Sequence, residues 1–215
     1  MLKFFYCNIL LNILFCKQAI SHFLDNKKIL LAEKKKMQNE DIYNSSLDLN
    51  LFLEKQFCKK LCYDYNNISP EKMVKRGKLI NKILGKTGKV FLIEQPFMCD
   101  YGYNIEIGEN FCSSHNLLIL DPAKVKFGKN VFIGPNCGFY TSCHPLDSQK
   151  RNKGFGSAKP ITVGNNVWIG GNVTVLPGVT IGDNVVVGAG SIVKYDIPSN
   201  TLAVGNPCQK IKELY

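Results

Sequence analysis

Apolar residues recur at every sixth position over the C-terminal half of the chain. This spacing predicts short flat strands that form the three sides of a triangular prism, with about eighteen residues to one coil. A helix would need a period of 3.6 and an amphipathic strand a period of two. Such coils stack through parallel backbone hydrogen bonds, so we predict a mainly β fold, a parallel β-helix of hexapeptide repeats. The positions that keep the spacing without a slip are Val163, Ile169, Val175, Ile181, Val187 and Val193.

The repeat extends upstream and is interrupted once. Phe127, Ile133 and Phe139 keep the same frame after a more irregular first part, and we assign residues 91–215 to the β-helix. Residues 145–160 (PLDSQKRNKGFGSAKP) lack the pattern, although a whole number of hexads separates Phe139 from Val163 and the chain returns in frame at Ile161. We therefore predict a loop at 145–160, extruded from one corner of the prism with His144 at its base. Segments that leave a rigid scaffold in this way often carry function.

The segment before the β-helix predicts a small N-terminal helical cap over residues 37–90. Apolar residues between positions 47 and 65 recur mostly at three- to five-residue intervals, as on one face of a helix. Ser69, followed by Pro70 and Glu71, is typical of an N-cap and first helical turn. A second helix is therefore expected to begin there and to end near residue 85.

Residues 1–36 are expected to be a leader outside the folded domain. Met1–Cys16 form an apolar stretch that is too short and too often interrupted by Asn for a spanning helix, and a basic tract follows. This pattern is typical of a targeting segment. Two alternatives stay open: a membrane-associating helix, and an upstream extension with translation starting at Met37. The location is therefore left open between the cytoplasm and an organelle, and membrane contact is expected only through this segment.

Composition narrows the choice of partners. The net charge is +10, which suits an anionic ligand such as a phosphorylated cofactor but also a surface of solvated charges. No basic run is interleaved with aromatic residues, so we predict no nucleic-acid binding. The nine cysteines include no C-x-x-C pair, so we predict no zinc site. Most of them are expected to be small buried hydrophobes in a reducing compartment.

Several stretches outside the hexads point to one family. The C-D-Y-G-Y-N and H-P-L-D elements are the most specific of them. With these stretches the chain resembles the maltose and galactoside O-acetyltransferases, a branch of the hexapeptide-repeat acyltransferases. The resemblance covers roughly residue 37 to the C-terminus, and the matching stretches are 96–110 (PFMCDYGYNIEIGEN), 140–147 (YTSCHPLD), 160–170 (PITVGNNVWIG), 177–184 (PGVTIGDN), 188–193 (GAGSIV), 196–200 (DIPSN) and 205–208 (GNPC).

The resemblance implies a left-handed β-helix, a homotrimer with sites between neighbouring prisms, and acetyl-CoA as co-substrate. The acetyl group would pass directly to a hydroxyl of a sugar or sugar-like small molecule. A hydroxyl attacks a thioester poorly unless a base takes its proton, and histidine is suited to that task near neutral pH. In this reading His144 of H-P-L-D is the catalytic base.

One catalytic position departs from the family pattern. Relatives commonly read N-F-N where this chain reads Ser114-His115-Asn116, so Ser114 stands in place of the Asn beside the catalytic His. The tetrahedral intermediate needs hydrogen-bond donors for its oxyanion. A Ser hydroxyl can donate but is shorter than an Asn amide, so we expect slower catalysis or a different acceptor. Asn116 keeps the second Asn and is expected near the substrate, or alternatively as a turn residue.

Two further residues are expected at the acceptor. Asp100 in C-D-Y-G matches a position that contacts the acceptor sugar, although a turn Asp that caps a backbone amide would look the same. Asn44, after Tyr43, corresponds to a segment that borders the acceptor site. The acidic residue usual there is absent, which leaves the identity of the acceptor open.

The acetyl-CoA side is expected along the C-terminal coils. By resemblance Trp168 and Gly171 border the pantetheine arm, and Ala189 lies further along. Small residues let the backbone approach a narrow ligand, but tight corner packing would favour them too. Lys194 and Lys212 are expected to contact the CoA phosphates. The family's two C-terminal Arg positions fall on Gln209 and Lys212 here, so basic charge is retained but without the bidentate contacts that Arg makes to phosphate.

Three alternative functions have to be compared with the sequence. A γ-type carbonic anhydrase shares this fold but needs three His ligands, and the domain offers only His115 and His144, because His22 lies in the leader; no metal is predicted. A catalytically weakened or nonenzymatic scaffold that binds CoA is suggested by Ser114, Tyr195 and Gln209. The third reading keeps the acyltransferase and moves its acceptor away from sugars.

Overall fold

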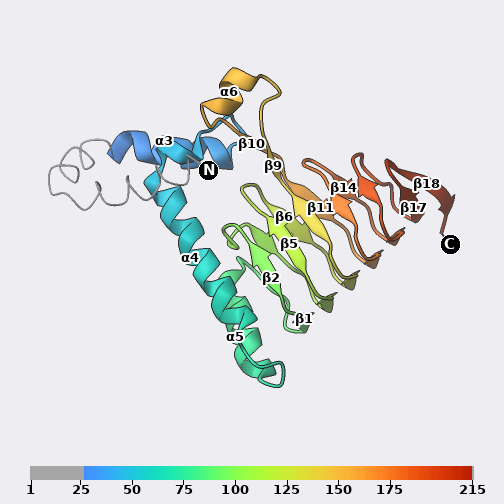
Figure 1. Cartoon of the computed structure of the whole chain (residues 1–215). Coiled ribbons are helices and arrows are strands. Elements are labelled where there is room, and N and C mark those ends of the chain that lie inside the picture. Colours follow the sequence, from blue (N-terminus) through green and yellow to red (C-terminus); the bar gives the residue numbers. More distant parts are fainter. Residues whose placement is uncertain (1–26, 215) are drawn as a thin grey trace.

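The computed structural model describes residues 27–214 and shows a triangular β-helix with helices across its N-terminal end (Figure 1). Most of the predicted leader, residues 1–26, lies outside the described residues. Helix α3 (Lys27–Gln38) crosses the boundary predicted at residue 37, and its Glu33 and Met37 are buried against the domain. Among the described residues, no helix combines the length and apolarity that a membrane span needs.

Three sheets form the sides of the prism, and the chain visits them in a fixed order from coil to coil. The first sheet ends in the only antiparallel pair of its ladder, β17 with β18, and its other strands pair in parallel. The first sheet holds β1 (Phe91–Ile93), β4 (Phe111–Ser113), β7 (Val131–Ile133), β12 (Val167–Ile169), β15 (Val185–Val187), β17 (Thr201–Gly205) and β18 (Cys208–Glu213). The second holds β2 (Phe97–Cys99), β5 (Leu117–Leu120), β8 (Gly138–Tyr140), β13 (Thr174–Val175) and β16 (Ile192–Val193), and the third holds β3 (Ile105–Glu106), β6 (Val125–Phe127), β11 (Ile161–Val163) and β14 (Thr180–Ile181).

Three corners join these sheets, and each corner stacks on its equivalent in the next coil. The Ser114 corner joins the first and second sheets at residues 94–96, 114–116, 134–136, 170–172 and 188–190. The loop corner joins the second and third sheets at residues 100–104, 121–124, 141–160, 176–179 and 194–196. The asparagine corner joins the third and first sheets at residues 108–110, 128–130, 164–166, 182–184 and 198–200.

The predicted hexad positions form the core. Ile169, Val175, Ile181 and Val193 are fully buried, and parallel registers such as Trp168 with Val186 give the later coils their eighteen residues. The first coils are longer, because Leu92 pairs with Cys112 and Cys112 with Phe132, twenty residues apart each time. The two extra residues fall in the loop corner. The buried residues Leu117 and Val125 on either side of it are eight positions apart, against six in the later coils.

The cap consists of α3, a 3-10 turn (Ser45–Leu47), α4 (Leu49–Asn66) and α5 (Met73–Ile83). Asp48 caps α4 by accepting the Asn50 and Leu51 amides. The prediction that Ser69 caps the second helix was wrong. Residues 69–72 instead form a turn closed by the Lys72 amide on the Ser69 carbonyl at 3.0 Å, and α5 begins one turn later with Lys72 as its N-cap residue.

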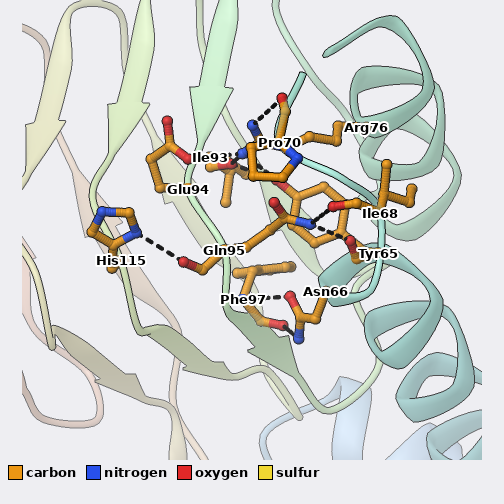
Figure 2. A network of polar contacts seen from close by, with 10 residues as sticks. All are labelled: Tyr65, Asn66, Ile68, Pro70, Arg76, Ile93, Glu94, Gln95, Phe97 and His115. Atoms are coloured by element: carbon orange, nitrogen blue, oxygen red, sulfur yellow. Dashed lines mark hydrogen bonds and ion pairs between the residues drawn. The ribbon is translucent and has the colours of Figure 1, made fainter. Parts of the chain in front are cut away.

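Helix α4 lies against β2, the first strand of the second sheet. At one end Asn66 and the backbone of Phe97 exchange two hydrogen bonds of 2.9 Å. Towards the other end Lys55 forms an ion pair of 2.8 Å with Asp100. Arg76 of α5 contacts the end of β1 in the first sheet, donating to the Ile93 carbonyl and pairing with Glu94, both at 2.9 Å (Figure 2). The cap therefore closes the open end of the prism.

The extruded segment folds back onto the cap of its own chain. It contains β9 (Ser142–Cys143), α6 (Ser148–Asn152) and β10 (Ser157–Ala158), and β9 pairs antiparallel with β10 at its base. Gly156 and Tyr43 exchange backbone hydrogen bonds of 2.8 and 2.9 Å. The loop is thus held between the loop corner and the start of the cap (Figure 1).

Candidate active site

His144 lies at the base of the extruded segment, directly after β9, and its side chain is exposed. Its Nδ1 lies 3.3 Å from the Phe155 carbonyl oxygen. A carbonyl oxygen only accepts hydrogen bonds, so Nδ1 carries the hydrogen in this contact. Neutral His144 therefore keeps the lone pair on Nε2 and can take a proton there.

Asn44 lies at the junction of the cap and the extruded loop, and it is buried. Its Nδ2 donates to the Lys153 carbonyl at 2.7 Å, and its backbone amide donates to Glu33 at 2.6 Å. Burial is the largest single effect on the Glu33 carboxyl, and by itself it would raise the pKa. The Lys36 ammonium and the Asn44 amide together outweigh it, so the pKa of Glu33 is lowered. Asn44 thus fixes the loop to the cap beside the His144 segment.

Asp100 is buried at the same corner, where Lys55 neutralises it. It sits in a turn organised by Asp121, which accepts the backbone amides of Asp100, Tyr101 and Gly102 at 3.0, 2.9 and 2.7 Å. Burial is the main reason that the pKa of Asp121 rises to about 6, while these amides oppose the rise. Burial and the Asp100 carboxylate also raise the pKa of Tyr43 to about 12. Asp121 was missed from the sequence, where it is only the polar residue that ends an apolar run.

Ser114 and Asn116 lie at a different edge, the Ser114 corner. Ser114 is half-buried, and Asn116 is exposed with a left-handed backbone (φ 60°) and donates to Asn136 at 2.8 Å. Gly171 and Ala189 occupy the same corner two and three coils further on, linked by the Gly190 amide on the Gly171 carbonyl at 2.9 Å. Four of the predicted site residues thus line one edge of the prism.

Close stacking at this edge explains some of its small residues. A Cβ on Gly170 would lie 2.6 Å from the Ala189 backbone nitrogen, so no larger residue fits there. A Cβ on Gly171 would meet Pro135 at 3.2 Å, a tighter contact than most side chains accept. The corner packing that the sequence left open as an alternative therefore operates at Gly171, whatever else the residue does.

The remaining predicted residues lie on the outer surface of the C-terminal coils. Trp168 points outward from β12 with 59% of its surface exposed. Lys194 is exposed beside the ring of Tyr195, with its ammonium 5.3 Å from the ring centroid. Lys212 is exposed on β18, opposite Leu202.

A groove of about 310 Å³ lies on the outer face of the second sheet, next to the Ser114 corner. Asn116 and Asn136 form its polar edge, and Met98, Leu118 and Tyr140 are among the residues of its floor. Its volume falls at the lower end of the range for small-molecule sites. A narrow apolar ligand with one polar end fits this chemistry.

Within one chain the predicted catalytic residues do not meet. His144 and Asp100 belong to the loop corner, to which Asn44 of the cap is joined through the Lys153 carbonyl, whereas Ser114 belongs to the next corner. The width of the second sheet separates them, and the four residues of β5 alone span about 13 Å at ~3.3 Å per residue. The two groups of predicted residues therefore lie apart within one chain.

His115, next to Ser114, is held by the cap. Its Nδ1 lies 2.8 Å from the Gln95 carbonyl oxygen, and the Gln95 side chain donates to the carbonyls of Tyr65 and Ile68 (Figure 2). His115 could be singled out from the sequence but Gln95 could not, because nothing near position 95 marks a contact with residues some thirty positions earlier. The network fixes the first turn of the Ser114 corner against α4.

Comparisons with known proteins agree with this arrangement. Residues 36–88 match the family described as maltose acetyltransferase hexapeptide capping motif, and residues 160–194 match bacterial transferase hexapeptide (six repeats). A Saccharomyces cerevisiae relative named "Putative acetyltransferase YJL218W" is 48% identical over 174 residues, which cover 81% of this chain and 89% of the yeast chain.

Solved structures of acetyltransferases are similar to this chain as well. A maltose O-acetyltransferase from Clostridium difficile 630 superposes with a TM-score of 0.84 at 46% identity, covering 85% of this chain and 97% of the other. A galactoside acetyltransferase in complex with coenzyme A gives 0.82 at 39% identity, with 85% and 91% covered. A hexapeptide-repeat acetyltransferase from Vibrio cholerae complexed with acetyl-CoA gives 0.78 at 33% identity, with 85% and 98% covered.

These likenesses confirm three predictions: the left-handed β-helix of hexapeptide repeats, the family and the enzyme class. They extend over cap and coils together, since both the capping motif and the hexapeptides match. The chain is an acetyltransferase and belongs to the maltose and galactoside O-acetyltransferase family of hexapeptide-repeat acyltransferases.

Proposed function

We propose that this protein transfers the acetyl group of acetyl-CoA to a hydroxyl of a sugar or sugar-like small molecule, with His144 as general base. The observation that carries the proposal is the contact between His144 Nδ1 and the Phe155 carbonyl oxygen, which leaves Nε2 as the basic nitrogen. The CoA complexes of similar structures support the donor. The names of the maltose and galactoside enzymes support a sugar-like acceptor.

The reaction needs no covalent enzyme intermediate. His144 Nε2 takes the proton of the acceptor hydroxyl while that oxygen attacks the thioester carbonyl carbon. The tetrahedral oxyanion accepts a hydrogen bond from the Ser114 hydroxyl. When the intermediate collapses, the carbon–sulfur bond breaks and the imidazolium returns its proton to the CoA thiolate. The products are the acetyl ester and free CoA thiol.

We further propose that the enzyme is a homotrimer whose sites lie between neighbouring prisms. The placement of Ser114 and His144 at different corners of one chain supports this, because a neighbouring copy can bring its Ser114 corner to the loop corner. Asp100, Asn44 and Asn116 would then border the acceptor. Trp168, Gly171, Ala189, Lys194 and Lys212 would bind acetyl-CoA, with the lysines against its phosphates.

A thiol-release assay with acetyl-CoA tests the chemistry across sugars, nucleosides and amines. His144→Ala should lower kcat by about 10²–10⁴-fold, the usual contribution of a general base. The matched control is His115→Ala, which removes a histidine from the neighbouring corner and should keep most of the activity. Full activity in His144→Ala would show that the base is another group. Acetyl-CoA binding without turnover on any acceptor would favour the nonenzymatic scaffold, and turnover on amines alone would move the acceptor away from sugars.

The shared site has its own test. His144→Ala and Ser114→Ala are each expected to be weakly active, and the two are unfolded together in equal amounts and refolded. If each site takes its His from one chain and its Ser from a neighbour, about a quarter of the sites regain both native residues. If both residues came from the same chain, mixing would restore nothing. A monomer in solution by ultracentrifugation would also contradict the shared site.

A further inference from the structure

Three cysteines converge where the cap meets the β-helix. Cys58 and Cys62 lie one turn apart on the same face of α4, and Cys99 is the last residue of β2. Cys99 Sγ lies 3.4 Å from Cys58 Sγ and 3.7 Å from Cys62 Sγ, and all three sulfur atoms lie within 4.8 Å of one another. All three side chains are buried. Across residues 27–214 this is the one group of three potential metal ligands so close together.

The spacing of the sulfur atoms suits one metal ion. A zinc–sulfur bond is about 2.3 Å long, so two thiolates at tetrahedral angles on one ion lie about 3.8 Å apart. The two measured sulfur–sulfur distances are within a few tenths of an ångström of that value. Small movements of three side chains would place every sulfur at bonding distance from a common centre.

The three side chains direct their sulfur atoms toward one point. A buried cysteine packs as a small hydrophobe wherever it lies, and such packing does not require its sulfur to contact two others. The backbones are held there independently, by the Asn66 contacts with Phe97 on one side and the Lys55 pair with Asp100 on the other. The cluster is therefore preorganised by contacts that do not involve its own thiols.

Charge favours a divalent over a monovalent ion. Three thiolates around a divalent cation leave one net negative charge, whereas a monovalent cation leaves two. All three side chains are buried, and the interior penalises uncompensated charge, so the smaller negative remainder is favoured. Sulfur ligands select thiophilic ions over Mg²⁺ or Ca²⁺. Three protein ligands leave a fourth coordination position open to water.

We propose that Cys58, Cys62 and Cys99 bind a thiophilic divalent cation, with zinc as the physiological candidate, and that the ion pins α4 to β2. Each bound thiol gives up its proton to solvent, so binding releases protons. The ion would sit one residue from Asp100 and one helical turn from Lys55, and so it would hold the ion pair at the acceptor side of the loop corner. The absence of a C-x-x-C pair predicted no zinc site, but the fold supplies the third sulfur from forty residues away.

Cadmium is the probe for this site, because cadmium–thiolate bonds absorb in the ultraviolet. The full chain is reduced, stripped with a chelator and titrated anaerobically with Cd²⁺, and zinc is then measured by competition. We expect one ion per chain and an absorption that grows to one equivalent. Cys99→Ser and Cys62→Ser should each bind more than about 100-fold more weakly, beyond the loss seen when only an outer-shell partner of a metal is removed. The matched control is Cys137→Ser, a buried cysteine outside the cluster, which should bind like the wild type.

Thermal unfolding keeps the test decisive if one variant folds poorly. An ion that binds only the folded chain raises its Tm, so Zn²⁺ should stabilise the wild type and Cys137→Ser but neither cluster variant. The proposal is overturned if the reduced wild type shows no thiolate absorption at one equivalent of Cd²⁺. It is overturned equally if Cys99→Ser and Cys62→Ser, folded by circular dichroism, bind as tightly as the wild type. Neither result depends on acetyl transfer.

Discussion

The asparagine corner contains Asn residues with a left-handed backbone, and replacing one of them by Gly or by Ala tests whether this conformation selects Asn. Asn130 has a φ of 56°, accepts a hydrogen bond from Asn110 at 3.0 Å and donates one to Asn166 at 2.8 Å. Asn130→Gly keeps the backbone conformation and removes both exposed hydrogen bonds, which should cost about 1–2 kcal/mol of unfolding free energy. Asn130→Ala removes the same bonds and forces an L residue with a Cβ into the left-handed region, which costs a further ~1–2 kcal/mol.

The larger backbone entropy of glycine in the unfolded chain offsets about 0.5–1 kcal/mol of that difference. Asn130→Ala should therefore be less stable than Asn130→Gly by about 1 kcal/mol. Guanidinium unfolding, followed by circular dichroism at one protein concentration, measures both variants. Lys126, exposed on β6 without a left-handed backbone, is the control site, and there Ala should be the more stable replacement. Equal stability of the two Asn130 variants, or a more stable Ala variant, would refute the claim that corner conformation selects Asn.

Three further changes test the core, the loop corner and the position where Ser114 replaces the family's Asn. Ile169→Ala should cost about 2–5 kcal/mol because Ile169 is fully buried between stacked coils, while Ile169→Val should cost about 0.5–1.5 kcal/mol; denaturant unfolding measures both. Because the pKa of Asp121 rises to about 6 in the folded state, stability from its protonated form is fully present below about pH 4 and lost as the pH rises through 6. Wild type should accordingly lose about 3 kcal/mol relative to Asp121→Asn between pH 4 and 7, and parallel pH profiles would contradict this. Ser114→Asn restores the family's amide and should raise kcat by about tenfold or more in the thiol-release assay, whereas no change would mean that Ser114 does not face the oxyanion.

The core of the later coils could be predicted from the sequence because a solenoid is built from near neighbours. In such a fold the residue that a side chain contacts lies one coil away, so a regular period fixes the contacts. Ile169 and Val187 illustrate this, since they are spaced eighteen residues apart and pair in the register of β12 and β15. The start of α5 was mispredicted for the opposite reason. Ser69 and Pro70 have the right local chemistry for a helix start, but Arg76 binds the Pro70 carbonyl and holds the segment as a turn.

Contacts that cross between repeat and non-repeat segments could not be predicted. The pairing of Tyr43 with Gly156 joins the cap to the extruded loop across more than a hundred residues, and no period connects them. The same holds for Cys99 and the two cysteines of α4. In both cases one partner belongs to the solenoid and the other to a segment whose placement depends on the cap as a whole.

The placement of Ser114 and His144 follows from coil length, which the motifs alone do not reveal. The two residues are thirty positions apart. A coil of twenty residues leads from Ser114 to Gly134 at the same corner, and the remaining ten residues cross the second sheet and enter the extruded segment, so Ser114 and His144 lie at successive corners. Residues at the same corner in successive coils, such as Ser114 and Gly134, share an edge instead. The two residues by which the early coils exceed eighteen lie in the loop corner, where they make room for the buried Asp121 and for the turn that carries Asp100. The departure from the repeat therefore coincides with the corner that carries His144, so coil length distinguishes this corner from the other two, which the regular hexads alone do not.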